Sequence, residues 1–217
     1  MSVLDSPRLP PRSGGAPDSL VILLHGYGAD GRDLIDLGGA WADLLPTTAF
    51  VSPHAPEPCE GAPMGRQWFA LGDMDPHDMV RGVAHAAPGL ARFIQGELQN
   101  ARLPASRLAL VGFSQGCMMA LAVALGMAQP PAAVVGYSGL YVPGPTPVEG
   151  TGAPPILLVH GTDDQLIPAQ ALFQSAYALA GADIPVEWHL SQGLAHGIDD
   201  AGLAHGGLFL AQRLAAA

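Results

Sequence analysis

Lysine is absent from this chain of 217 residues, and its nine basic side chains, all arginine, face nineteen aspartates and glutamates. The formal net charge is −10, and no run of arginines occurs in the sequence. A protein that binds nucleic acid needs clustered basic side chains against the phosphates, so we expect no nucleic-acid partner. Only 13% of the residues are charged and 49% are apolar, which provides a large buried core and excludes a disordered chain.

Cysteine is also scarce, because Cys59 and Cys117 are the only two. Two cysteines cannot form a disulfide framework, and a reducing cytoplasm is the simplest compartment for such a chain. The first residues contain no apolar stretch of the length that a secretory signal needs. The longest apolar run, 117–128, falls short of the roughly 20 residues that cross a bilayer. We therefore expect a core helix there and no stable membrane insertion.

Short apolar runs alternate with longer segments along the chain. We predict strands for six runs rich in apolar or β-branched residues, at 20–24, 48–52, 107–111, 132–137, 155–160 and 186–190. We predict helices at 33–45, 77–99, 115–127, 169–180 and 199–214, with Pro88 either kinking the second helix or marking its true start. This alternation is typical of an α/β fold with a mainly parallel central sheet and helices on both faces. We expect a single domain over 1–217, in which 1–18 form a Pro/Gly-rich N-terminal arm.

Two proline-rich segments fit neither a helix nor a strand pattern. Residues 53–76 contain five prolines and predict a long ordered loop, which in compact domains is usually functional. Residues 142–155 form a second predicted loop, too short for a cap domain. We therefore expect no large cap domain above the sheet.

The pentapeptide Gly112-Phe113-Ser114-Gln115-Gly116 lies between a predicted strand and a predicted helix. A serine in this G-x-S-x-G spacing occupies a strained turn where flanking side chains would clash, and its hydroxyl is held out above a helix N-terminus. By composition alone the pattern arises in about one chain of six, but its position makes Ser114 our candidate nucleophile. Ser138 lies in a similar segment that lacks the final glycine, and we interpret it as a strand-end turn.

A serine nucleophile needs a base, and the base needs an orienting acid. After a nucleophile turn of this kind the acid and then the base follow in the chain, each on a loop after a later strand. The loop after the predicted strand 155–160 contains Asp163 and Asp164. Either aspartate could cap the next helix or face water, and we favour Asp164 as the acid.

Eight histidines are candidates for the base. His196 lies on a glycine-bounded loop just before the last predicted helix, and we predict it as the base. His205 lies inside that helix, where a rigid backbone would hold it away from the serine. His25 and His160 end predicted strands, and we expect both to be structural.

Acyl transfer also requires an oxyanion hole. With this nucleophile turn, one donor is the N–H of the following residue, Gln115, and the other comes from the loop after an early strand. The glycine-rich segment 25–31 follows the strand 20–24, and we expect Tyr27 to supply the second N–H. The same segment matches neither G-x-G-x-x-G nor the phosphate-binding P-loop, whose lysine this chain lacks.

Together these segments resemble the carboxylesterase, lysophospholipase and acyl-protein thioesterase family of small α/β-hydrolases. The resemblance covers nearly the whole chain after the N-terminal arm, and it is carried by LHGYG at 24–28, RQWF at 66–69, GFSQG at 112–116, HGTDDQLIP at 160–168 and AHG at 195–197. It implies the α/β-hydrolase fold. The family pattern H-G-x-x-D-x-x-V-P implies Asp164 as the acid, with Ile167 in place of valine, and Cys117 stands where many members have glycine.

The resemblance also implies that a flap segment lies against the acyl group of the substrate. We predict four substrate-binding residues: Met64, Trp68, Phe69 and Leu166. Ordinary loop packing is the alternative for Met64, Trp68 and Phe69, and the sequence leaves it open.

The sequence therefore predicts a serine hydrolase that cleaves short to medium acyl esters through an acyl-enzyme, with no metal and no cofactor. Thioesters and lysophospholipids stay open as substrates, because the same three residues cleave them. The alternative is a non-hydrolytic binding protein on the same scaffold. We expect a small-molecule ester as partner and a cytoplasmic location, and we leave open a homodimer.

Overall fold

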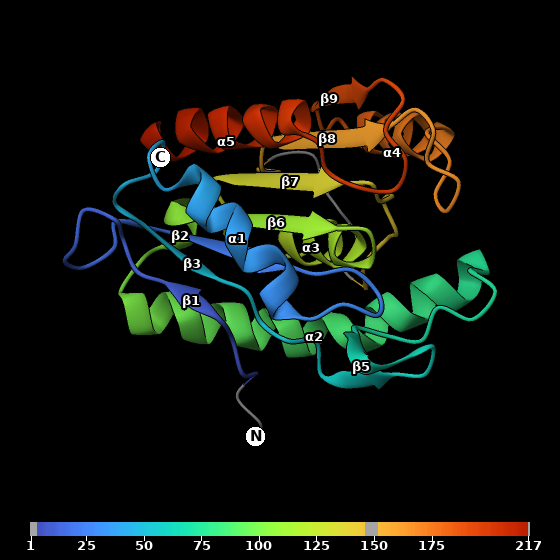
Figure 1. Ribbon diagram of the computed structural model, residues 1–217, viewed down its shortest axis with the longest axis horizontal. Helices are drawn as coiled ribbons and strands as arrows, with labels where there is room; N and C mark the ends of the chain where they lie inside the picture. Colours follow the sequence, from blue (N-terminus) through green and yellow to red (C-terminus); the bar gives the residue numbers. More distant parts are fainter. Residues whose placement is uncertain (1–3, 146–151, 217) are drawn as a thin grey trace.

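The computed structural model describes residues 4–145 and 152–216. Its centre is a seven-stranded sheet in the order β1-β3-β2-β6-β7-β8-β9, drawn in Figure 1. The strands are β1 (Arg8–Leu9), β2 (Ser19–Leu24), β3 (Thr48–Val51), β6 (Leu108–Phe113), β7 (Ala133–Tyr137), β8 (Ile156–Gly161) and β9 (Val186–Ser191). All neighbours are parallel except β1 and β3. The predicted mainly parallel sheet is confirmed.

Five α-helices of the described residues cover the sheet on both faces, as predicted. They are α1 (Gly31–Trp41), α2 (Pro76–Ala101), α3 (Gln115–Leu125), α4 (Gln170–Ala180) and α5 (Asp200–Ala215). Side chains of β2 alternate between the faces: Leu20, Ile22 and Leu24 pack in a core with α2, α3 and α4, whereas Val21 and Leu23 pack in a second core with α1 and α5. Because both faces are covered, the strand reads as one continuous apolar run. In Figure 1, α1 crosses in front of the sheet and α3 lies behind it.

Of the two alternatives for Pro88, the one in which it marks the start of α2 is wrong, because Pro88 lies inside the helix. The helix begins at Pro76, where the missing N–H removes no hydrogen bond, and it continues through Pro88 to Ala101. The Asp75 side chain caps it by accepting hydrogen bonds from the N–H groups of His77 and Asp78. One face of α2 is buried along its whole length, and this packing offsets the hydrogen bond that Pro88 removes.

The proline-rich segment 53–76 is not an irregular loop throughout. It contains an antiparallel hairpin of β4 (Glu57–Cys59) and β5 (Ala62–Gln67), with an irregularity between Pro58 and Cys59. The sequence hid this hairpin because prolines argue against a central strand. A two-stranded hairpin tolerates them, since each strand has one edge that needs no partner.

The N-terminal arm contributes to the sheet. Within it, β1 pairs with the outer edge of β3, matching Arg8 to Val51 and Leu9 to Phe50. The Arg8 guanidinium donates two hydrogen bonds, of 2.6 and 2.8 Å, to the Glu97 carboxylate on α2. The arm is therefore anchored to both the sheet and a helix.

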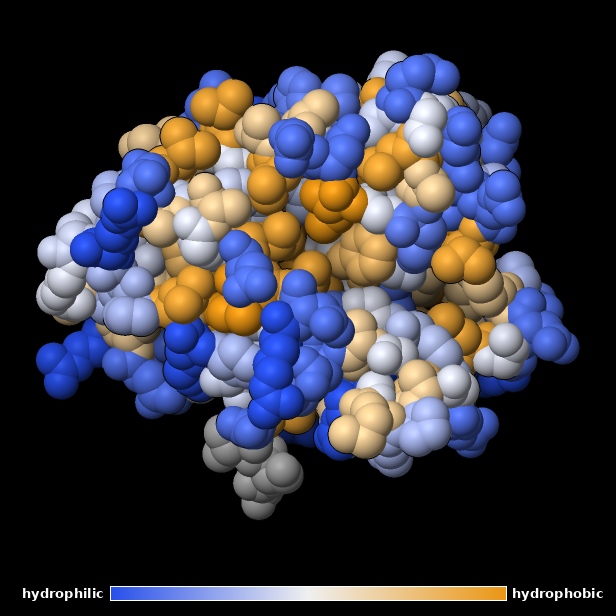
Figure 2. Space-filling view, viewed as in Figure 1, coloured by the Kyte–Doolittle hydropathy of each residue, from blue (hydrophilic) through white to orange (hydrophobic). Residues whose placement is uncertain are grey.

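Apolar side chains also reach the surface on the face that carries α1 and α5, and Figure 2 shows them gathered across its middle. Leu44, just after α1, and Leu208, on α5, are both half-exposed. Nothing in the structure shows a second copy against this face, so a homodimer stays a prediction. Over 4–145 and 152–216, no helix is long and apolar enough to span a membrane.

Candidate active site

Three strands of the sheet each deliver one predicted catalytic residue at their carboxyl ends. Ser114 follows β6, Asp164 follows β8 and His196 follows β9. These strands run parallel to one another within the sheet, so their carboxyl ends share one edge. Such an edge is where open α/β sheets usually place a ligand site.

Ser114 occupies a strained turn between β6 and α3. Its φ is 54° and its ψ is −116°, in the left-handed half of φ where most side chains are disfavoured. A Cβ on Gly112 would lie 2.2 Å from the Gly116 carbonyl oxygen, and a Cβ on Gly116 would lie 1.9 Å from that of Leu24. Both glycines are therefore required. The Ser114 hydroxyl makes no capping bond to α3, which leaves it available for chemistry.

The buried carboxylate of Asp164 is held from two sides. Its Oδ1 accepts hydrogen bonds of 2.9 Å from the N–H groups of Leu166 and Ile167, and its Oδ2 lies 2.7 Å from Nδ1 of His196. Burial opposes ionisation, but the hydrogen bonds from Ile167 and His196 hold the pKa of Asp164 below its usual value. An ionised Asp164 accepts a hydrogen bond from the Nδ1–H of His196, and this fixes the tautomer in which the other ring nitrogen can accept a proton. Asp163, in contrast, is exposed and accepts a hydrogen bond from Thr162.

The His196 ring packs against Phe113, the residue before the serine, with ring centroids 4.9 Å apart. The next residue, Gly197, accepts a 2.9 Å hydrogen bond from the Ser138 hydroxyl at the end of β7. The sequence predicted only a turn at Ser138, and the φ of 46° at this residue fits that prediction. The contact between the Ser138 hydroxyl and Gly197 was not predicted. His205 lies on α5 and stacks on His189, at 4.1 Å between centroids.

The loop predicted to contribute Tyr27 to the oxyanion hole passes directly against the serine. A Cβ on Gly26 would lie 3.3 Å from Cβ of Ser114. The hairpin holds this loop in place, because Arg66 on β5 accepts a hydrogen bond from the Gly28 N–H and donates its own N–H to the Ala29 carbonyl. Gln115 begins α3, so its N–H is one of those without a partner inside the helix.

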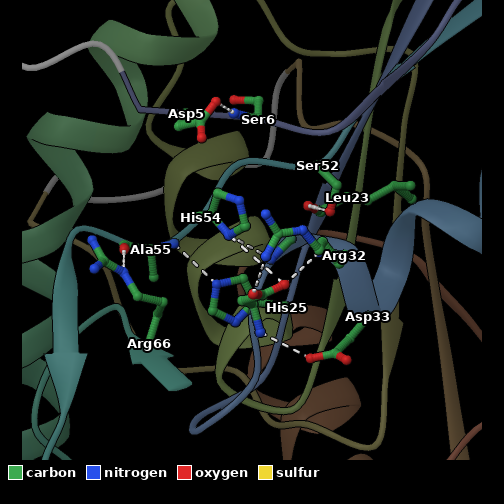
Figure 3. A network of polar contacts seen from close by, with 12 residues as sticks. Asp5, Ser6, Leu23, His25, Arg32, Asp33, Ser52, His54, Ala55 and Arg66 are labelled. Atoms are coloured by element: carbon green, nitrogen blue, oxygen red, sulfur yellow. Dashed lines mark hydrogen bonds and ion pairs between the residues drawn. The ribbon is translucent and has the colours of Figure 1, made fainter. Parts of the chain in front are cut away.

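The His25 side chain holds the loop 25–31 in place by hydrogen bonds, which fits the structural role that we expected for it. Its Nε2 accepts a 2.9 Å hydrogen bond from the Ala55 N–H, so the ring proton is on Nδ1, which lies 2.7 Å from the Gly26 carbonyl oxygen. Burial lowers the pKa of His25 and favours the neutral ring. In Figure 3 the Ala55 carbonyl in turn accepts a hydrogen bond from the Arg66 guanidinium.

The Gln115 side chain ties the predicted flap to the nucleophile turn. It is fully buried, accepts a 2.9 Å hydrogen bond from the Trp68 N–H and donates a 2.7 Å hydrogen bond to the Phe69 carbonyl. The Trp68 indole N–H also donates to the His25 carbonyl, at 2.9 Å. The flap, the loop 25–31 that we predict to contribute to the oxyanion hole (the oxyanion loop) and the turn at Ser114 are thus joined by hydrogen bonds into one unit.

The four predicted substrate-binding residues fall into two pairs. Trp68 and Phe69 are 1% and 3% exposed and belong to the hydrophobic core, which favours the packing alternative for both. Met64 and Leu166 are 92% and 68% exposed. Contact of any of the four with a substrate stays a prediction.

A cavity of about 930 Å³ lies beside this unit, between α2 and the segment that contains the hairpin. Its lining includes Leu90, Phe93, His54, Arg66 and Trp68, and none of Ser114, Asp164 and His196 borders it. Among the residues that the structure describes, no group of three or more His, Cys, Asp or Glu side chains converges to hold a metal ion.

The chain is similar to known proteins of one hydrolase family. The family model described as Phospholipase/Carboxylesterase matches residues 12–213. The esterase YpfH of Escherichia coli (strain K12) is 30% identical over 183 residues, covering 83% of this chain and 77% of that protein. Acyl-protein thioesterase 1 of Gibberella zeae is 26% identical over 194 residues, covering 81% of this chain and 82% of that one. The crystal structure of esterase PE8 superposes with a TM-score of 0.91 at 40% identity, over 98% of this chain and 100% of that one.

Proposed function

Because the chain belongs to the phospholipase/carboxylesterase family of hydrolases, we propose that it cleaves carboxylic esters through an acyl-enzyme formed on Ser114. The observation that carries this proposal is the 2.7 Å contact between Asp164 and His196, on the sheet edge where the strained Ser114 turn lies.

In the proposed reaction, the Ser114 hydroxyl attacks the ester carbonyl carbon while His196 takes its proton. The N–H groups of Gln115 and Tyr27 bind the oxyanion of the tetrahedral intermediate. The imidazolium that forms is stabilised by the Asp164 carboxylate, and it donates its proton to the departing alcohol. In the second half of the reaction, water attacks the acyl-enzyme while His196 takes its proton. His196 then returns the proton to the Ser114 oxygen, and the carboxylic acid is released.

We propose short to medium acyl esters as substrates. The order of elements in the described chain contains no inserted cap domain, and Ser114 is partly exposed, which supports a soluble ester as the substrate. The thioesterase named among the relatives keeps acyl thioesters as a second substrate class, and lysophospholipids stay open as well. A single domain over 1–217 and a cytoplasmic location also stay proposals.

The test is Ser114→Ala, assayed with p-nitrophenyl esters and acyl-CoA thioesters from C2 to C16. We expect a loss of several orders of magnitude with an unchanged melting temperature, because a small side chain outside the core is removed. Labelling of the wild type by a fluorophosphonate, mapped to Ser114 by mass spectrometry, identifies the nucleophile directly. A variant that keeps more than about a tenth of the rate, a loss under about 1.4 kcal/mol, would show that the nucleophile assignment is wrong. Absent labelling would favour the non-hydrolytic binding protein.

A further inference from the structure

A second histidine lies against the carboxylate of Asp164. His160 is the next-to-last residue of β8, and its side chain is 1% exposed beside an Asp164 side chain that is 0% exposed. Its Nε2 is 2.7 Å from the Ile167 carbonyl oxygen and 3.3 Å from Oδ2 of Asp164. Both neighbours are hydrogen-bond acceptors, so Nε2 carries a hydrogen that lies between them.

His160 therefore acts on both oxygens of the carboxylate. Oδ2, which it approaches, is the oxygen that binds Nδ1 of His196. By donating to the Ile167 carbonyl, His160 also closes the turn whose N–H groups, from Leu166 and Ile167, hold Oδ1. A buried carboxylate with donors on both oxygens has one orientation.

We propose that His160 is a positioning residue of the catalytic triad, which fixes the direction of the Asp164 carboxylate and limits its attraction for the His196 imidazolium. This inference rests on the proposed function. An N–H beside a carboxylate stabilises its negative charge and lowers its proton affinity. Removing that N–H strengthens the attraction of the Asp164 carboxylate for the His196 imidazolium, so we expect the rising limb of kcat/KM to lie at higher pH.

Four other titratable groups on the surrounding elements contact groups other than Asp164 and His196. Asp163 accepts from the Thr162 hydroxyl, Asp199 accepts from Ser191 and from the Gly202 N–H, His189 stacks on His205, and the Tyr137 hydroxyl donates to the Gly202 carbonyl. Within the described ranges, the side chains that bond or pair with Asp164 are those of His160 and His196. A shift in the pH profile of a His160 variant therefore reports on this contact.

The experiment compares His160→Leu, which removes the N–H, with His160→Gln, whose amide keeps an N–H at similar reach. Rates are expressed per active site, counted by complete fluorophosphonate labelling. For His160→Leu we expect kcat to fall at least about tenfold, KM to change by less than about threefold, and the rising limb of kcat/KM to move to higher pH. His160→Gln is expected to keep kcat within about threefold of the wild type and to leave the limb in place.

Thr162→Val is the matched control. The Thr162 hydroxyl accepts a 2.7 Å hydrogen bond from the Gly193 N–H. It therefore joins the loop that carries Asp164 to the loop that carries His196, without a hydrogen bond to Asp164 itself. This variant should lower the melting temperature without moving the limb.

The inference is overturned if His160→Leu leaves the limb in place, if Thr162→Val moves it equally, or if His160→Gln loses more than about tenfold in kcat. The Gln variant decides the question even where the Leu variant does not fold. Turnover by Ser114→Ala would refute the proposed function itself. An inactive Ser114→Ala together with unaltered His160 variants would refute only the role of His160.

Discussion

Replacement of Gln115 by methionine tests the hydrogen-bonded unit behind the proposed oxyanion hole. Methionine has nearly the same length and volume, so the packing is kept while both hydrogen bonds are lost. The Trp68 N–H and the Phe69 carbonyl then remain in the core without a partner. An unpaired buried group costs about 1–3 kcal/mol, so Gln115→Met should lower the free energy of unfolding by about 2–6 kcal/mol.

For a chain of this size each kcal/mol lowers the melting temperature by about 2–4 °C, so calorimetry should show a decrease of about 4–24 °C. The matched control is Gln67→Met, at the end of β5 and next to Trp68. Gln67 is also buried, but it makes one hydrogen bond of 3.2 Å, to Glu57, and its Oε1 has no partner in the described chain.

Because Gln67→Met removes a buried atom that is already unpaired, we expect it to lower the free energy of unfolding by under about 1 kcal/mol. Equal losses in the two methionine variants, measured by urea titration, would refute the reasoning. Equal losses would mean that the two hydrogen bonds of Gln115 contribute no more to the free energy of unfolding than its packing does.

Three further predictions concern the acid, the flap and the oxyanion loop. Asp164→Asn should lower kcat by about 10⁴-fold, because the imidazole tautomer is lost, whereas Asp163→Asn should stay within about tenfold; the reverse order in steady-state kinetics would assign the acid to Asp163. Trp68→Ala should lower the free energy of unfolding by about 3–5 kcal/mol, as for a buried aromatic, and leave the C4-to-C8 ratio of kcat/KM unchanged; an altered ratio at a constant melting temperature would place Trp68 in the acyl site instead. His25 has a folded pKa below its ordinary 6.5, so the unfolded chain binds the proton first as the pH falls, and stability decreases below about pH 6.5 by up to about 1.4 kcal/mol per pH unit. His25→Gln, whose amide oxygen can still accept the Ala55 N–H, should flatten the melting temperature between about pH 5 and 7.5, and an unchanged slope would exclude His25 as the cause.

The features that the sequence predicted are those encoded locally. Apolar runs identified the inner strands, because both faces of the sheet are covered. The spacing around Ser114 predicted the nucleophile turn, since steric exclusion at Gly112 and Gly116 acts on the immediate backbone. The preference for Asp164 over Asp163 used a family pattern, and it agrees with the contact to His196.

The features that the sequence did not predict depend on contacts between distant segments. Gln115 meets Trp68 only when α3 packs against the hairpin segment, and no local pattern encodes that meeting. Pro88 is tolerated inside α2 because one face of the helix is buried. His160 was expected to be structural at the end of a strand, and its contact with Asp164 depends on how the following loop folds back.

The neighbouring strands β2 and β6 have a consequence for how the chain folds. Leu20 pairs with Leu108, while α1, β3, the hairpin and α2 all lie between them in the sequence. The backbone of Gly116 rests on the carbonyl of Leu24, so the nucleophile turn is complete only after these two strands have joined. Contacts between such distant segments form slowly, because a long loop must close first. During refolding, helical circular dichroism should therefore recover before esterase activity, and the return of activity measures the closing of the central sheet.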